Sequence, residues 1–419
     1  MIAEHYPWPA VDGIRQRLDH VVRGLARAGE VELVALDRRT EDEQRGATDP
    51  GIDQLVDVTT VPVQPEAGTR EWLPDWVRRG AAPRRLLVAD WSGMAEVVRR
   101  RLADTSAPPI DLIWFSHVDS WWPLRDAAPD TASIADFYDL IHLALRLRRR
   151  TPPRFAPAAS APDRARTAGR WVVSRGFDVV DERRWERVQR ECAAHVDRVV
   201  VCSELDRRRL ELPGVEVIGN GSAAPDVVHP DRRALRGDAP SFLFVGALDY
   251  EPNSEAVEWF VREVFPVVRR RVPDAQLRIV GRGSEQVAWV ADVPGVELVG
   301  RAPEMQPELD RADVSIVPIR VGAGTRLKVV EALANHLPLV TTPVGCEGID
   351  VTDGVDAMIT DDAGRFADEC VRLATDGELR QRLADAGAEL FAARYDWDII
   401  ERDLAALAAE VVERHAARR

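Results

Sequence analysis

The residues best suited to chemistry lie between Pro318 and Leu333, in a glycine-rich turn that leads from an apolar run into a helical pattern. Gly322 and Gly324 in this turn let the backbone approach a ligand closely. Thr325 is a suitable N-cap for the helix that follows. Free N–H groups and the positive end of a helix attract phosphate. The segment therefore predicts a phosphate-binding turn.

Two basic side chains strengthen this prediction. Arg326 and Lys328 fall in the first helical turn, where a cation without a nearby anion is mildly unfavourable. Lys328 is also the only lysine among the 56 basic residues, so the chain has kept a compact ammonium here and used arginine elsewhere. Both observations indicate that an anion binds beside this turn.

An acidic side chain shares the same helix face. Glu331 lies three residues after Lys328, which brings the two side chains together on a helix. A carboxylate accepts hydrogen bonds from two vicinal hydroxyls, which is the geometry of ribose recognition. The pattern predicts a phosphate at the helix tip and a diol one turn further on. The alternative is an exposed Lys–Glu pair without a ligand.

Short apolar runs that alternate with amphipathic stretches position this turn, and such alternation is typical of parallel sheets with helical connections. The strands expected in this half are residues 241–246, 276–281, 296–299, 314–317 and 339–342, with helices at 253–268 and 325–335. Ligands bind beyond the carboxyl ends of such strands. Gly246, Gly281 and the glycines at 322 and 324 fall at those ends.

The N-terminal half has a weaker pattern of the same kind. Its expected strands are residues 31–36, 110–115, 131–135, 196–201 and 215–218, and its first helix is 15–28. Residues 146–170 are rich in Pro, Ala and Arg and predict an exposed insertion without a fixed shape. Residues 1–4 are short for a central strand, which leaves open an earlier start of the chain.

Size and composition set the broad class. A chain of 419 residues exceeds a single core. We expect an N-terminal domain at 1–225, a C-terminal domain at 226–395, and a last helix within 396–419 that returns to the first domain. The net charge of −14 argues against nucleic acid as a partner. Without an apolar run long enough to cross a bilayer or a secretory signal, we expect a cytoplasmic protein with no stable membrane insertion.

Four segments of the C-terminal half resemble the retaining family 4 glycosyltransferases. They are Phe244-Val-Gly-Ala-Leu-Asp-Tyr-Glu-Pro-Asn, Leu277-Arg-Ile-Val-Gly-Arg-Gly, Val296-Glu-Leu-Val-Gly-Arg and Glu331-Ala-Leu-Ala-Asn-His-Leu-Pro-Leu-Val-Thr-Thr-Pro. The likeness covers roughly the core of the C-terminal domain. The N-terminal half is similar more faintly, through His5-Tyr-Pro-Trp-Pro with Asp12-Gly13, Cys202-Ser-Glu-Leu-Asp and Asn220-Gly221.

The resemblance implies an α/β fold of the GT-B type, with two Rossmann-like domains that face each other across a cleft. It also implies transfer of a sugar from a nucleotide diphosphate sugar, the co-substrate, to an acceptor hydroxyl with net retention, and neither a metal nor a bound cofactor. We expect a soluble acceptor, a secondary metabolite or a saccharide, because the acidic chain lacks an obvious basic amphipathic helix.

Carried over by position, the resemblance assigns roles to single residues. Glu331 would hold the ribose, Arg326 and Lys328 the diphosphate, and Gly13 a loop near the phosphates. His117, at the end of an N-domain strand, would face the donor sugar, although a histidine packed beside a core strand fits the sequence equally well. The remaining donor-side positions are Gly246, Arg282, Gly300, Gly322, Ala323, Gly324 and Thr325, with Gly300 near the nucleobase.

The sequence departs from the family pattern at two places. The family often carries a first glutamate eight positions before the second, and here that position is Ala323. Backbone N–H groups of Ala323 and Gly324 would then contact the donor sugar. An Arg and a Lys that many members carry after the first C-domain strand are replaced near Ala247 and Ser254. More of the phosphate charge would therefore fall on Arg326 and Lys328.

Other polar and aromatic residues have two readings each. Asp136 and Asp139 suit helix caps better than an acceptor site. Trp114, Trp121 and Trp122 could pack in a core or stack on a sugar ring. For the whole chain, the alternatives are a glycosyltransferase of cell-surface polysaccharide assembly, a sugar-nucleotide-binding protein without catalysis, and a phosphorylase-like enzyme with pyridoxal phosphate on Lys328, for which the chain is short.

Overall fold

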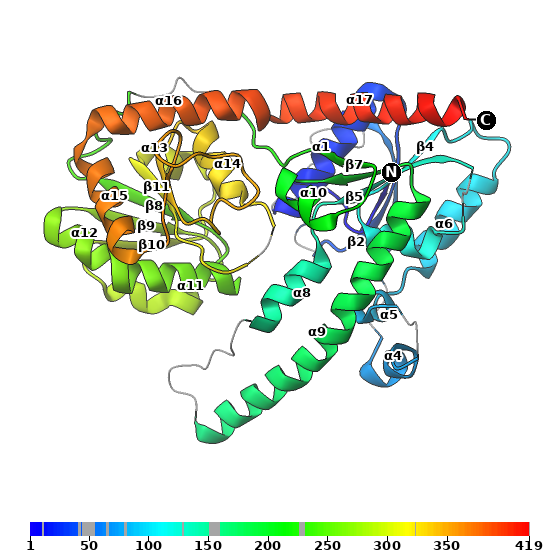
Figure 1. The fold of residues 1–419 in the computed structure, drawn as a ribbon, viewed down its shortest axis with the longest axis horizontal. Coiled ribbons are helices and arrows are strands. Elements are labelled where there is room, and N and C mark those ends of the chain that lie inside the picture. Colours follow the sequence, from blue (N-terminus) through cyan, green and yellow to red (C-terminus); the bar gives the residue numbers. More distant parts are fainter. Residues whose placement is uncertain are drawn as a thin grey trace. The chain divides into compact units, whose positions relative to one another are not determined.

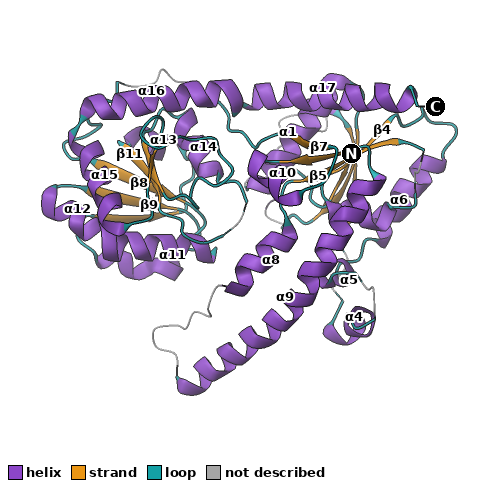
Figure 2. Cartoon of the chain, in the orientation of Figure 1, coloured by secondary structure: helices purple, strands orange, loops and turns teal. Residues whose placement is uncertain are grey.

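The computed structural model describes residues 1–10, 12–40, 43, 55–63, 67–78, 82–127, 130–150, 160–225, 231–322 and 324–418. Its internal contacts divide the chain into two units. Unit 1 comprises Met1–Gly219 and Ile400–Arg419, and unit 2 comprises Asn220–Ile399. Each unit is a parallel sheet with helices, as Figure 1 and Figure 2 show. The prediction of an α/β chain with two Rossmann-like parts is confirmed.

The described strands of unit 1 form one parallel sheet in the order β3-β2-β1-β4-β5-β6-β7. They are β1 Ile2–Ala3, β2 Glu32–Asp37, β3 Asp57–Pro62, β4 Leu112–Phe115, β5 Ala132–Phe137, β6 Arg198–Val201 and β7 Val215–Val217. From β1 the strands follow one another to one edge of the sheet, as β1, β2 and β3, and from β4 to β7 they follow one another to the other edge. The region beyond the carboxyl ends of β1 and β4 is therefore the switch point, where such sheets bind ligands. The sequence did not predict β3.

Helices cover both faces of this sheet. They are α1 Gly13–Ala28, α4 Thr69–Trp76, α5 Arg84–Val88, α6 Ser92–Ala103, α7 Val118–Trp121, the 3₁₀ turn η1 Trp122–Leu124, α8 Ile141–Arg150, α9 Ala161–His195 and α10 Glu204–Leu210. One apolar cluster joins α1 to β1 and β2 through Leu18, Val22 and Leu33. A larger cluster, with Met94, Phe115 and Trp185, fills the other face.

The expectation of a shapeless insertion at 146–170 is wrong for its described residues, which belong to α8 and α9 (Figure 1). Ion pairs explain why an arginine-rich segment is helical here. Arg146 and Arg149 of α8 both pair with Glu182 of α9, at 2.8 and 2.7 Å. Arg148 pairs with Asp178 at 3.1 Å. The carboxylates that stabilise α8 lie some 30 residues away in the sequence, so local composition could not reveal them.

The last helix, α17 Trp397–Ala416, begins in unit 2 and continues into unit 1. Within unit 1, Glu401 of α17 contacts two side chains of α1: His20 at 2.7 Å and Arg27 at 2.5 Å. A Cβ atom at Gly24 of α1 would lie only 2.8 Å from the Cβ of Leu404. The glycine thus allows close packing of α1 against α17.

The described strands of unit 2 form a second parallel sheet in the order β10-β9-β8-β11-β12-β13. They are β8 Ser241–Val245, β9 Gln276–Val280, β10 Val296–Gly300, β11 Val314–Val317, β12 Leu339–Thr341 and β13 Met358–Ile359. The five strands predicted in this half are confirmed within one residue at each end, and β13 was not predicted. The switch point lies beyond β8 and β11.

Helices of unit 2 are α11 Glu251–Trp259, α12 Phe265–Arg271, α13 Gln306–Arg311, α14 Leu327–Ala334, α15 Ala363–Thr375 and α16 Gly377–Arg394, with the 3₁₀ segment η3 Ser284–Asp292. The expected helix at 253–268 is interrupted by a π-helical segment, η2 Phe260–Val264. Pro266 lies two residues after this segment and has no N–H to donate, which accounts for the change of pitch.

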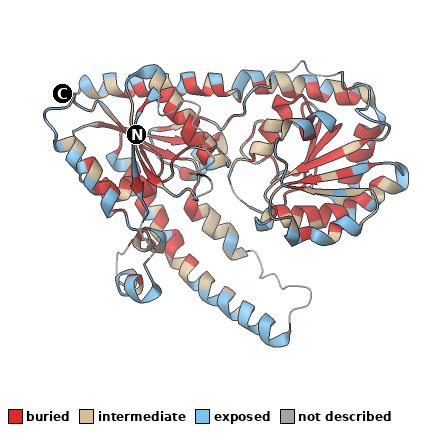
Figure 3. Ribbon diagram, turned by 180° about the vertical axis from the view of Figure 1, so that it is seen from behind, coloured by how far each residue is buried: buried red, intermediate tan, exposed pale blue. Residues whose placement is uncertain are grey.

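Burial follows the layers in each unit. Figure 3 shows buried strands and exposed outer helix faces. All four cysteines are buried. Among the residues that the structure describes, no helix combines the length and the apolar character needed to cross a membrane.

Candidate functional site

The candidate site of unit 2 is centred on Lys328. Its ammonium Nζ donates a hydrogen bond of 2.7 Å to Oδ1 of Asn253 in α11. The same nitrogen lies 4.6 Å from the centroid of the Phe244 ring on β8, a cation–π distance. Asn253 is fixed in turn, because its Nδ2 donates to the carbonyl of Ala247 at 2.8 Å. The sole lysine therefore lies at the switch point of the unit 2 sheet.

Two glycines make room for this arrangement. A Cβ atom at Gly246 would lie 2.7 Å from Nζ of Lys328 and 2.9 Å from the amide of Asn253. A Cβ at Gly281 would lie 1.8 Å from the carbonyl oxygen of Gly246. The loops after β8 and β9 can approach each other and Lys328 only because neither position carries a side chain.

The electrostatic state of Lys328 follows from its surroundings. Burial, together with the neighbouring Arg326, lowers the pKa of Lys328 to about 7, and Glu331 counteracts only part of this shift. Burial raises the pKa of Glu331, against the opposing effect of Lys328. An anion bound beside the ammonium would favour its charged form.

Glu331 lies one turn into α14 and forms no side-chain hydrogen bond or ion pair with the residues that the structure describes. Because Lys328 bonds to Asn253 instead, the alternative of an exposed Lys–Glu pair is wrong. The half-buried carboxylate keeps its acceptor capacity for a ligand. Its role as a ribose ligand remains a prediction.

The glycine-rich turn before α14 has the backbone that glycine permits: φ is +123° at Gly322 and +85° at Gly324. Ala323 lies outside the described residues. The predicted N-cap is wrong, since α14 begins at Leu327 and its N-cap is Arg326, with no side-chain capping bond. The hydroxyl of Thr325 is buried and has no hydrogen-bond partner in the described part of the chain.

The predicted cations differ in their positions. Arg326 is buried, and a Cβ at Gly322 would lie 2.8 Å from its Nη2. Arg282 follows β9 and pairs with Asp249 at 3.1 Å, in an exposed place. Gly300 ends β10 with φ +74°. Arg326, Lys328 and Gly246 thus surround the turn, whereas Arg282 already has a carboxylate partner.

Unit 1 has a polar cluster at its own switch point. Glu4 follows β1, and its buried carboxylate accepts hydrogen bonds from the hydroxyls of Ser116 and Tyr138. His117, the N-cap of α7, is also buried, and its Nδ1 lies 3.4 Å from Oδ1 of Asp119. Arg85 pairs with the other oxygen of Asp119 at 2.7 Å.

These charges set the state of His117. Burial by itself lowers the pKa of His117, but the carboxylates of Asp119 and Glu4 raise it above its ordinary value overall. Burial would raise the pKa of Asp119, but His117 and Arg85 hold it below its usual range. The histidine is therefore buried beside a strand and ion-paired, which agrees with the reading of a histidine packed beside a core strand. Contact with a donor sugar remains a prediction.

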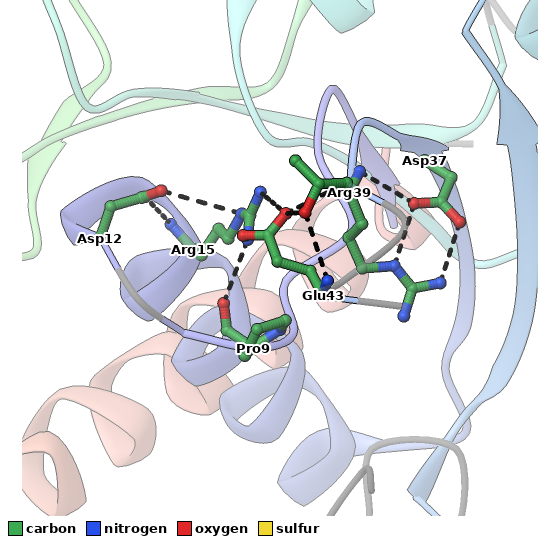
Figure 4. A network of polar contacts seen from close by, with 7 residues as sticks. Pro9, Asp12, Arg15, Asp37, Arg39 and Glu43 are labelled. Carbon is green, nitrogen blue, oxygen red and sulfur yellow. Dashed lines mark hydrogen bonds and ion pairs between the residues drawn. The ribbon is translucent and has the colours of Figure 1, made fainter. Parts of the chain in front are cut away.

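Gly13 is the first residue of α1, and a network of polar contacts fixes the loop before it (Figure 4). The Asp12 side chain accepts from the backbone N–H of Arg15 at 3.0 Å. Arg15 in turn pairs with Glu43 at 2.7 Å. This contact and the backbone of Thr40 lower the pKa of Glu43 to about 2. The charge of Arg15 is thus already compensated, which leaves the helix N-terminus at Gly13 as the phosphate-attracting feature of the loop.

Three other sequence readings are now decided, for Asp136, Trp114 and Trp121, and that for Trp122 stays open. Asp136 caps no helix: it lies in β5, and its carboxylate accepts two hydrogen bonds from the buried Arg17, at 2.7 and 3.0 Å. Trp114 and Trp121 are core residues, so they stack on no sugar ring. Trp122 is half-buried and lies under the guanidinium of Arg125.

Sequence reasoning missed Asn253, Glu4 and Asp119. Asn253 ends the segment from Phe244 that carries the family resemblance, and this position was the available signal. Asp119 lies two residues after His117, and this spacing at a strand end was the available signal.

Comparisons with known proteins agree with this geometry. Residues 239–376 match the model of the family described as "Glycosyl transferases group 1". Among solved structures, sucrose-phosphate synthase from Thermosynechococcus elongatus is similar with a TM-score of 0.64 and 18% identity, over 98% of both chains. HepE from Anabaena, in complex with UDP-glucose, has a TM-score of 0.60 and 11% identity, over 98% of both chains.

A third structure, the lipopolysaccharide outer core galactosyltransferase WaaB, has a TM-score of 0.59 and 12% identity, over 97% of this chain and 98% of that one. A curated relative, an uncharacterized 44.6 kDa protein in the cps region of Klebsiella pneumoniae, is 29% identical over 134 residues, which are 30% of this chain and 34% of the relative. The matched segment thus spans about a third of that relative.

The two sheets and their switch points define the class as the GT-B fold of glycosyltransferases. The match to the glycosyl transferases group 1 model lies within the second unit, at residues 239–376.

Proposed function

We propose that this chain is a glycosyltransferase that moves a sugar from a nucleotide diphosphate sugar to a hydroxyl of an acceptor, with retention of anomeric configuration and without a metal. The observation that carries the proposal is the position of Lys328. Its ammonium lies between Asn253 and the Phe244 ring, next to the glycine-rich turn at the switch point of unit 2.

The diphosphate of the donor would lie at the turn and contact Lys328 and Arg326. Negative charge grows on this diphosphate as it leaves the anomeric carbon, and cations fixed in a poorly hydrated place stabilise such charge strongly. The backbone N–H groups around Gly324 add further donors. Two cations of the chain would thereby do the work for which other enzymes use a metal ion.

Glu331 would orient the nucleoside part. Its half-buried carboxylate has no protein partner among the described residues, and two ribose hydroxyls are donors that match it. The solved complexes of HepE contain UDP and UDP-glucose, so a uridine donor is the first to test.

The transfer would be a front-face substitution. The bond from the acceptor oxygen to the anomeric carbon forms on the side from which the diphosphate oxygen departs, and the acceptor proton moves to that leaving oxygen. No protein nucleophile is required in this scheme. His117 would contact the donor sugar.

Thermal stabilisation by UDP-, GDP- and dTDP-glucose tests the proposal, since a ligand of the folded state raises Tm by mass action. We expect one of the three to raise Tm and the other two to act weakly. Incubation of that donor with acceptor hydroxyls in the presence of EDTA should then give an α-linked product, visible in the anomeric proton coupling. If no sugar nucleotide binds at millimolar concentration, the proposal fails. Binding without transfer to any acceptor would favour a non-catalytic sugar-nucleotide-binding protein.

A further inference from the structure

Unit 1 contains a cavity of about 300 Å³ that the donor site proposed above does not use. We call it the arginine cavity. Its polar lining consists of Glu4, His5, Arg38, Arg84, Arg85 and Asp119. Glu4 and Arg38 follow the carboxyl ends of β1 and β2, and Asp119 follows β4. The cavity therefore lies at the ligand-binding edge of the unit 1 sheet, with α5 as one wall.

Two of its arginines present their charge to solvent. Arg38 is exposed, donates Nε to the backbone carbonyl of Glu4 at 3.1 Å, and forms no ion pair with the residues that the structure describes. The side chain of Arg85 is 51% exposed, although its Nε contacts Asp119. Both guanidinium groups thus keep N–H donors for a ligand.

The third arginine is only loosely compensated. Arg84 lies 3.8 Å from a carboxylate oxygen of Asp178 and 3.9 Å from one of Asp181. Asp178 also pairs with Arg148 and Arg175, at 3.1 Å each. Arg84 thus has no close ion pair of its own, because both carboxylates lie 3.8 Å or more from it and Asp178 also serves two other arginines.

The negative groups of the cavity are buried. Glu4 is 1% exposed and Asp119 is fully buried, so they lie behind the exposed guanidinium groups. Glu4 already accepts from two hydroxyl side chains, which shows that its carboxylate suits hydroxyl donors. His5 adds little charge, because burial lowers its pKa. The cavity thus combines accessible cations with buried acceptors.

We propose that the arginine cavity binds a sugar or polyol phosphate. The phosphate would contact Arg38 and Arg85, since a planar guanidinium group can donate two parallel hydrogen bonds to two phosphate oxygens. The hydroxyls of the same molecule would point toward the wall of the cavity that Glu4 and His5 line. A volume of about 300 Å³ is at the small end of ligand sites and fits a single phosphorylated monosaccharide.

The role of this ligand rests on the function proposed above: the phosphorylated sugar would be the acceptor. In the transfer, one of its hydroxyl oxygens forms the bond to the anomeric carbon, the bond from that carbon to the diphosphate breaks, and the hydroxyl proton leaves with the diphosphate. The binding itself requires no donor, so it is testable alone.

Calorimetric titration with glucose 6-phosphate, glucose and glucuronate tests the proposal on wild type, Arg38→Gln, Arg85→Gln and the control Arg100→Gln. Arg100 lies on α6 in the same unit, is 76% exposed and pairs with Glu96, so its variant makes the same charge change outside the cavity. We expect glucose 6-phosphate to bind the wild type and the control equally, and about tenfold or more weakly to each cavity variant. Glucose should bind far more weakly and without difference between variants.

Arg38→Gln keeps this test decisive even if Arg85→Gln destabilises the fold by leaving Asp119 unpaired. The proposal is overturned by absence of glucose 6-phosphate binding at millimolar concentration, by equal weakening in Arg100→Gln, or by equal affinity for glucose. Equal affinity for glucuronate would show that the cavity does not prefer a phosphate to a carboxylate, which also overturns the proposal. Failure of UDP-sugar binding with retained glucose 6-phosphate binding would instead remove only the proposed transferase function.

Discussion

Lys328 and Asn253 are joined by a hydrogen bond of 2.7 Å between Nζ and Oδ1, which links the start of α14 to α11 across 75 positions of sequence. A neutral amide satisfies one donor of the ammonium but does not neutralise its charge. The ammonium is therefore held in place, partly buried, and still ready for an anion.

Substitution Lys328→Ala should reduce sugar transfer by about a hundredfold or more, because it removes a fixed cation beside the leaving diphosphate. Tm should change little or rise, since the ammonium is costly to bury. Lys328→Arg should not restore activity, because Nζ already lies 2.7 Å from the Cβ position of Gly246 and a guanidinium is larger. Initial rates with the identified donor measure the effect. Wild-type turnover in Lys328→Ala would remove the lysine from the mechanism.

The lowered pKa of Lys328 predicts proton uptake on donor binding. In the free protein the pKa is about 7, so the amine is mostly neutral at pH 8. A diphosphate raises this pKa, and the complex should take up close to one proton at pH 8. Calorimetry in buffers of different ionisation enthalpy counts the protons. Lys328→Met supplies the control and should show no uptake, and an identical proton count in both proteins would contradict the assignment.

The same shift gives a dependence of stability on pH. A lowered lysine pKa means that the unfolded chain, with the ordinary pKa of 10.5, holds more protons than the folded one between about pH 7 and pH 10.5. The contribution of Lys328 to the free energy of unfolding therefore rises with pH in this interval. Lys328→Met should stabilise the protein near pH 7 by up to a few kcal/mol and less toward pH 10. Urea titrations at the two pH values compare the proteins.

Glu331→Ala should weaken binding of the free nucleoside diphosphate by roughly 1–3 kcal/mol, because the ribose hydroxyls lose a charged acceptor. The affinities of the wild type and of Glu331→Ala for the 2′-deoxy nucleotide should differ less. Glu263→Ala changes the charge of unit 2 equally at an exposed position and serves as the matched control. Calorimetry measures these affinities. Unchanged affinity of Glu331→Ala for the nucleoside diphosphate would contradict the assignment of Glu331 to the ribose.

The ion pair of Arg17 and Asp136 should matter for stability. Both side chains are 2% exposed, so Asp136→Ala leaves an uncompensated buried guanidinium. We expect a loss of about 3–5 kcal/mol. Glu96→Ala, which breaks the exposed pair with Arg100, should cost less than about 1 kcal/mol. Thermal unfolding of the two variants compares these losses of stability. Equal Tm values would show that burial of the pair of Arg17 and Asp136 does not make it contribute more to stability than the exposed pair.

The sequence by itself was sufficient for five of the six described strands of the second half. Apolar runs such as 314–317 and 339–342 needed no tertiary information, since strands buried on both faces are continuously apolar. The glycine-rich turn and the helix with Lys328 and Glu331 were also predictable, because the residues that indicate them lie close together in the sequence. The two-residue strands β1 and β13 gave too short a pattern to reveal their place in a sheet.

Only the tertiary structure decided which partners these residues have. Lys328 could have paired with Glu331 on its own helix, yet the sheet order brings Asn253 within reach and the pair does not form. Asp136 looked like a cap until β5 placed it against Arg17, more than a hundred residues away. Local pattern fixes the strands and helices because each follows its own periodicity. The pairing of distant charges depends on the order of strands in the sheet, which no short segment encodes.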